Sequence, residues 1–211
     1  MEELYHIHLK QNYDYKWQVG KSIIIPNNFD STMNKRYNNF TQKILILDGN
    51  NPQYNSIYNQ LAALFFKLDS VNKIDKDMFE ELKNTLKITF DLTYRADFFK
   101  RETSLENCRK DYYLKRPSRL HSLFLCDKDG LEYWEDIIGN NKTKKYSIYK
   151  VLTNNVFKTN EQLLPNEFNT YEEAYNNAHK YWKPKFDDVE NSCNEYLAQG
   201  EIKILEKIKE V

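Results

Sequence analysis

A block of helical periodicity separates two strand-rich ends in this chain of 211 residues. Apolar residues recur at helical spacing in two stripes, one over 57–68 and one over 77–100. The pattern Thr103-x-x-Glu106 is typical of a capping box and predicts a further helix from residue 103. The order of these segments predicts an α+β fold, a single domain over 1–211 with a helical insertion at about 55–114.

Short apolar runs bounded by Gly, Pro or Asn predict the strands on each side of the block. The expected strands cover 4–10, 22–25, 43–47, 120–126, 146–152, 193–198 and 202–208. The last segment, 201–211, also fits a helix. Outside the block, a helix is predicted over 131–138, and the capping-box pattern Thr170-x-x-Glu173 predicts another.

Charge and hydropathy exclude several broad classes of protein. The chain has 31 basic and 31 acidic residues, so its net charge of zero gives no general attraction to nucleic acid, although a local patch remains open. The longest apolar runs, 23–25 and 61–66, are far shorter than the roughly 20 residues that span a bilayer. With no apolar leader at the start, we expect a cytoplasmic protein without a membrane partner.

The three cysteines are widely spaced and form no C-x-x-C pair, so we expect neither a disulfide framework nor a zinc site. We likewise expect no metal cofactor. Two of the titratable residues within predicted strands are candidate site residues: His6 near the start and Glu195 near the end. A carboxylate inside a strand is exposed, paired or functional, because burying an unpaired charge is costly.

The segment 116–126 places Arg116 and Arg119 directly before an apolar strand. Guanidinium groups suit the geometry of phosphate. Between Arg95 and Arg119 there are eight basic and four acidic residues, a local excess of four. A solvated helix face with a basic loop and a site for a phosphate-bearing ligand or nucleic acid both account for this pattern.

The order of the motifs resembles the ADP-ribosyltransferase superfamily, in its His–aromatic–Glu branch. Leu4-Tyr5-His6 looks like the opening His strand of that branch, and the segment from Ser122 to Tyr133 looks like its central strand and following helix. The segment 195–202 looks like the last strand of DNA-targeting toxins of the superfamily. The chain is also similar to an uncharacterised bacterial family in three segments: 116–119, 157–161 and 181–182.

The resemblance implies a split mixed and antiparallel sheet, with NAD as substrate and no metal. It implies that His6 binds the nicotinamide-side ribose, that Tyr133 stacks on nicotinamide, and that Glu195 is catalytic. Arg119 is the expected pyrophosphate ligand. Phe124 stands where the branch often has Tyr, and Tyr5 and Ser122 belong to the same NAD site.

Three functions remain open from the sequence. The first is NAD-dependent ADP-ribosyl transfer to a protein or nucleic-acid acceptor. The second is a catalytically inactive relative or an unrelated partner-binding module. The third is nucleic-acid binding by the basic segment, with an affinity that falls steeply with salt.

Overall fold

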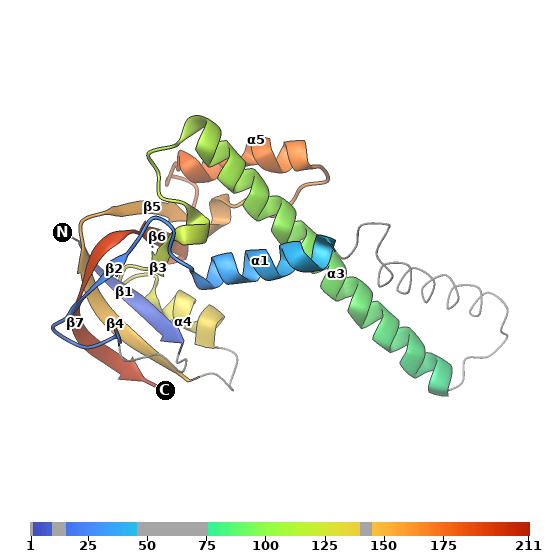
Figure 1. Ribbon diagram of the computed structural model, residues 1–211, viewed down its shortest axis with the longest axis horizontal. Coiled ribbons are helices and arrows are strands. Elements are labelled where there is room, and N and C mark those ends of the chain that lie inside the picture. The colour runs from blue at the N-terminus through green and yellow to red at the C-terminus, as the bar shows by residue number, and fades with distance from the viewer. Residues whose placement is uncertain (1, 10–15, 46–75, 140–144) are drawn as a thin grey trace. The chain divides into compact units, whose positions relative to one another are not determined.

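The computed structural model describes residues 2–9, 16–45, 76–139 and 145–211. The chain divides into two units, one of Met1–Asn34 with Arg101–Val211 and one of Lys35–Lys100. The first unit holds both sheets (Figure 1). The predicted insertion at about 55–114 differs from these bounds and stays a prediction. The helical stripe at 57–68 lies outside the described residues.

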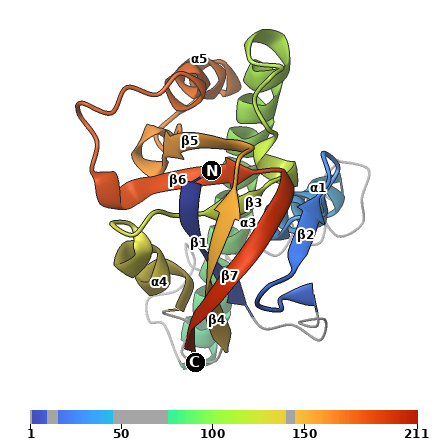
Figure 2. The same ribbon diagram turned by 90° about the vertical axis from the view of Figure 1, so that its left-hand side faces the viewer.

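Two antiparallel sheets confirm the α+β class (Figure 2). The larger sheet has the strand order β1 (Glu2–Leu9), β4 (Tyr146–Thr153), β7 (Gly200–Glu210), β2 (Ser22–Ile25). The smaller sheet has the order β3 (Leu123–Leu125), β6 (Asn194–Ala198), β5 (Val156–Asn160). The C-terminal segment is therefore a strand, not a helix.

The two sheets meet where β1 passes β3. The Tyr5 amide donates to the Cys126 carbonyl at 2.8 Å, and the Cys126 amide donates to the Tyr5 carbonyl at 2.9 Å. One hydrophobic cluster draws side chains from both sheets, including Leu4, Leu125, Tyr196 and Ile202. The faces of β1 and β6 that carry Leu4 and Tyr196 thus line one shared core.

Two further clusters pack helices against these sheets. Helix α5 (Tyr171–Trp182) places Trp182 against Leu197 of β6 and Leu105 of α3 (Lys76–Tyr112). Helix α4 (Leu131–Gly139) packs against β1 and β4 through Leu131, Trp134, Ile7 and Ile148. The predicted capping box at Thr170 is confirmed, because its hydroxyl accepts from the Glu173 amide at 3.2 Å.

The predicted start of a helix at Thr103 is wrong. Helix α3 runs without a break over Lys76–Tyr112, so Thr103 lies in its interior. No Gly or Pro occurs in this stretch, and without a break the backbone amides near Thr103 are already paired within the helix. The predicted strand at 43–47 is also wrong where it is described, because helix α1 covers Thr32–Leu45.

The unit of residues 35–100 contains parts of α1 and α3. Arg36 donates to the Tyr94 hydroxyl at 2.6 Å, and its guanidinium carbon lies 4.7 Å from the centroid of the Phe98 ring. Tyr37 and Phe99 stack with centroids 5.1 Å apart. Among the described residues of both units, no helix combines the length and the apolar character needed to cross a membrane.

Candidate functional site

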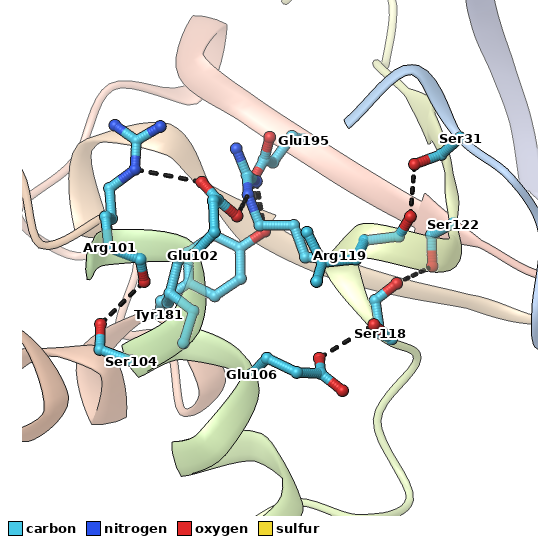
Figure 3. A network of polar contacts seen from close by, with 12 residues as sticks. Ser31, Arg101, Glu102, Ser104, Glu106, Ser118, Arg119, Ser122, Tyr181 and Glu195 are labelled. Atoms are coloured by element: carbon cyan, nitrogen blue, oxygen red, sulfur yellow. Dashed lines mark hydrogen bonds and ion pairs between the residues drawn. The ribbon is translucent and has the colours of Figure 1, made fainter. Parts of the chain in front are cut away.

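Glu195 is buried at the centre of a polar network (Figure 3). Its side chain lies on β6 and only 2% of the residue is exposed. One carboxylate oxygen, Oε1, accepts hydrogen bonds from Arg119 Nη1 and from the Tyr181 hydroxyl. The carboxylate is therefore buried and paired, and its partners offset the cost of burying a charge.

Arg119 links Glu195 to a second buried carboxylate, Glu102. Arg119 lies in a 3₁₀ helix over Arg119–His121, directly before β3. Its Nε donates to Glu102 Oε2 at 3.1 Å, and its Nη1 also donates to the Tyr181 hydroxyl at 2.8 Å. Arg101 donates from Nε to the other oxygen of Glu102 at 3.1 Å. Two guanidinium groups thus alternate with two carboxylates, and their formal charges cancel.

The electrostatics of the network follow from burial opposed by pairing. Burial raises the pKa of Glu195, and the charge of Arg119 and the Tyr181 hydroxyl oppose that rise. Burial alone would lower the pKa of Arg119, but the charges of Glu195 and Glu102, together with the Tyr181 hydroxyl that accepts from Arg119, hold that pKa well above its ordinary value. Arg119 is therefore a permanent buried cation that requires its carboxylates.

The network joins four elements that are distant in sequence: α3, the 3₁₀ helix before β3, α5 and β6. Arg119 and Glu195 are 76 residues apart, and Arg119 and Tyr181 are 62 apart. Phe124 closes one side, with its ring centroid 4.9 Å from the Arg119 guanidinium carbon. Chemically, such a network fixes the packing of these elements, and it leaves Arg119 engaged rather than open to a pyrophosphate.

His6 lies at the junction of the two sheets. Its Nδ1 lies 3.0 Å from the Phe124 carbonyl oxygen, which can only accept, so Nδ1 carries the proton and donates. The His6 ring stacks on Trp17 with centroids 4.5 Å apart. Burial, helped by the nearby charge of His8, lowers the pKa of His6 to about 3, against the partial opposition of the bond to Phe124. His6 is thus a neutral imidazole with Nε2 as an acceptor.

This depressed pKa makes folding sensitive to acid. The unfolded His6 has a pKa near 6.5 and binds a proton between pH 6.5 and pH 3 that the folded state excludes. The contribution of His6 to the free energy of unfolding is thus fully present above pH 6.5, and it decreases as the pH drops. Between pH 7 and pH 5 we expect His6 to account for a loss of about 2 kcal/mol.

Urea denaturation of wild type and His6→Asn at pH 7, 6 and 5 measures this loss. The Asn variant keeps an N–H donor but does not titrate in this range. We expect the difference in unfolding free energy between the two proteins to shrink toward pH 5. A difference that is the same at all three pH values would contradict a neutral, half-buried His6.

Tyr133 and Ser122 have partners of their own. The Tyr133 hydroxyl donates to Glu161 Oε2 at 2.6 Å, and the Tyr133 ring lies edge-on to Trp134. Ser122 is fully buried, and its hydroxyl donates to the Ser118 carbonyl at 2.7 Å. Among the described residues, no three His, Cys, Asp or Glu side chains gather as ligands for a metal.

The structure brings together the strands of the predicted motifs but separates two of their side chains. Strand β3 pairs with β6, where Phe124 faces Leu197, and it meets β1 at Tyr5. Side chains alternate along a strand, so Glu195 shares the face of Leu197, next to α5, whereas His6 shares the face of Leu4, toward the core between the sheets. In the described part of the chain, His6 and Glu195 share no hydrogen bond.

Glu102, Arg101 and Tyr181 complete the network and were not predicted as site residues. Tyr181 precedes Trp182 at the end of a helix that the capping box predicts, so its burial could be expected from the sequence. Glu102 gives no such signal, because in the sequence it lies among charges of both signs in a long helical segment.

Residues 4–210 match the model of DUF2441, described as a protein of unknown function. No curated protein matches the chain.

Proposed function

Because the chain belongs to the DUF2441 family, whose function is unknown, we propose from its geometry that it is a non-catalytic, partner-binding module of ADP-ribosyltransferase-like fold. In this proposal Glu195, expected from the resemblance to be catalytic, stabilises the fold instead. Its setting is the cytoplasm, as the composition predicts. The proposal requires no NAD turnover and no metal.

The burial of Glu195 carries this proposal. A catalytic carboxylate must touch its substrate, and here the carboxylate is 2% exposed, with Oε1 bonded to Arg119 and Tyr181. To reach a ribose hydroxyl, it would have to leave both partners, and Arg119 would keep only one carboxylate, that of Glu102. The likeness to the superfamily rests on the order of the motifs and on the neighbouring positions of β1, β3 and β6.

The stability of Glu195→Gln tests the structural role. Glutamine keeps the shape and one acceptor but removes the charge, so Arg119 loses one of its two carboxylate partners. We expect the free energy of unfolding to fall by about 2 kcal/mol, the range of a hydrogen bond to a charged group. Glu201→Gln, an exposed carboxylate on β7, is the matched control and is expected to change stability by less than about 0.5 kcal/mol.

Thermal unfolding with and without NAD completes this test. We expect the same melting temperature in both conditions, because in this proposal NAD does not bind the folded state. A Glu195→Gln variant as stable as the Glu201→Gln control, together with an NAD-dependent rise in melting temperature, would contradict the proposal.

ADP-ribosyl transfer is the second candidate, and the neighbouring strands of its three motifs favour it. NAD would be the substrate, and the acceptor would be a protein or a nucleic acid. Neutral His6 would offer Nε2 to a ribose hydroxyl, and Tyr133 would stack on nicotinamide. This candidate requires Arg119 to release Glu195 when NAD binds, and it requires that nicotinamide release be lost in Glu195→Gln.

A further inference from the structure

A polar groove lies beside the C-terminal end of α3, in the unit that contains both sheets. Its volume is about 310 Å³. Its lining includes three cationic side chains and three side-chain amides: Arg109, Lys115, Arg116, Asn27, Asn155 and Gln199. A neighbouring hollow of about 520 Å³ shares Lys115 and Arg116 with the groove and adds Tyr112 and Tyr113. No Asp or Glu is among the described residues that line either space.

The loop that carries these cations is held in place by its own contacts. Arg109 donates to the carbonyl of Arg116 at 3.0 Å and pairs with Glu106 at 2.7 Å. The Ser118 hydroxyl donates to the other oxygen of Glu106 at 2.9 Å. The Glu106 carboxylate is therefore already paired with Arg109 and Ser118, and it balances the charge of Arg109.

Lys115 and Arg116 supply the charge that remains. Both side chains are exposed, and neither forms an ion pair with any residue that the structure describes. The Arg116 guanidinium carbon lies 4.5 Å from the centroid of the Phe157 ring, which orients it beside the groove. Two adjacent unpaired cations, with amide donors next to them, suit a phosphate backbone.

An exposed aromatic ring stands next to these cations. Tyr112 is 64% exposed, although its ring contacts His179 with centroids 4.9 Å apart. Its neighbour Leu114 is 74% exposed. A site for single-stranded nucleic acid has two parts: cations along the path of the phosphate backbone, and an exposed aromatic ring on which a base stacks.

From these features we infer that the groove and the adjoining hollow bind single-stranded nucleic acid. Lys115 and Arg116 contact the phosphates, the amides of Asn27, Asn155 and Gln199 line the path of the strand, and one base stacks on Tyr112. A duplex does not fit this arrangement, because its bases are already stacked on one another. The inference deepens the proposed function by naming the partner of the binding module, and it holds with or without NAD turnover.

Fluorescence anisotropy with labelled 12-nucleotide probes tests the inference. The probes are oligo-dT, oligo-U and a 12-base-pair DNA duplex, and AMP is the competitor that separates a strand site from a mononucleotide site. We expect binding of a single-stranded probe that AMP does not displace at equal concentration. With two phosphate contacts, affinity should fall about sevenfold between 50 and 200 mM salt. Tighter binding to the duplex, equal competition by AMP, or no binding at 50 mM salt would overturn the inference.

Variants locate the site on the protein. Lys115→Gln with Arg116→Gln is expected to weaken binding at least tenfold at 50 mM salt and to flatten the salt dependence. Tyr112→Ala is expected to weaken binding about tenfold, and Tyr112→Phe, which keeps the ring, to leave it unchanged. Lys128→Gln with Lys203→Gln removes the same charge at exposed positions outside the groove and is the control. Equal weakening in this control and in the Lys115 and Arg116 variant would assign the binding to net charge and reject the groove.

Discussion

Arg119→Met is expected to lower the free energy of unfolding by about 3–5 kcal/mol, because it removes the cation between two buried carboxylates. Glu102 is 1% exposed and Glu195 is 2% exposed, so neither can recover its charge stabilisation from water. Arg101 still pairs with Glu102, but Glu195 keeps only the Tyr181 hydroxyl. Urea denaturation at pH 7, followed by tryptophan fluorescence, measures this loss.

A variant without the buried carboxylates separates lost charge pairing from lost packing. Arg119→Met together with Glu102→Gln and Glu195→Gln leaves no unpaired carboxylate, and Arg101, with 22% of its side chain exposed, can turn to solvent. Neutral groups of similar volume often replace a buried ion pair at little cost, so we expect the triple variant to recover at least half of the loss. A triple variant no more stable than Arg119→Met would show that the ion pairs do not set the stability of this region.

The second large effect is expected for Trp182→Ala, at about 3–5 kcal/mol. Trp182 has no exposed surface and packs in the cluster that joins α5, the end of α3 and the smaller sheet. Its indole Nε1 donates to the Leu105 carbonyl at 2.8 Å, and its ring stacks on Phe157 with centroids 5.7 Å apart. Alanine leaves a cavity, and the Leu105 carbonyl loses the indole donor and keeps only its acceptor bond within α3.

Trp182→Phe is the matched control for this effect. Phenylalanine keeps most of the aromatic packing but cannot donate to Leu105, so we expect a smaller loss of about 1–2 kcal/mol. Urea denaturation monitored by far-ultraviolet circular dichroism avoids a readout that depends on the replaced tryptophan. A loss below about 1 kcal/mol in Trp182→Ala would mean that this cluster does not hold α5 on the sheet.

Local signals in the sequence predicted most of the elements outside the central block. Ser22–Ile25, stopped by Pro26, is a strand with the predicted bounds, and the Thr170 capping box begins α5. The same pattern at Thr103 failed, because a four-residue pattern with two fixed positions can occur inside any helix, and it marks a helix start only where the helix is interrupted. The apolar run at 43–47 failed because short apolar runs do not separate strands from helices.

The network around Glu195 could be predicted only in part. A carboxylate inside a strand signalled a residue that is exposed, paired or functional, and the structure shows that it is paired. Its partner Arg119 was assigned to a pyrophosphate because guanidinium chemistry is the same for both ligands. The pairing depends on contacts between residues 17 to 76 positions apart, and spacing along one sequence carries no information on such contacts.

Nicotinamide release from NAD by the purified protein tests most directly whether Glu195 is structural. The assay compares wild type with Glu195→Gln in the presence of cell extract, DNA or RNA as acceptor, with an active ADP-ribosyltransferase as the positive control. We predict no release above the protein-free background from either protein. Release by wild type that is lost in a folded Glu195→Gln variant would contradict the structural role and establish ADP-ribosyl transfer.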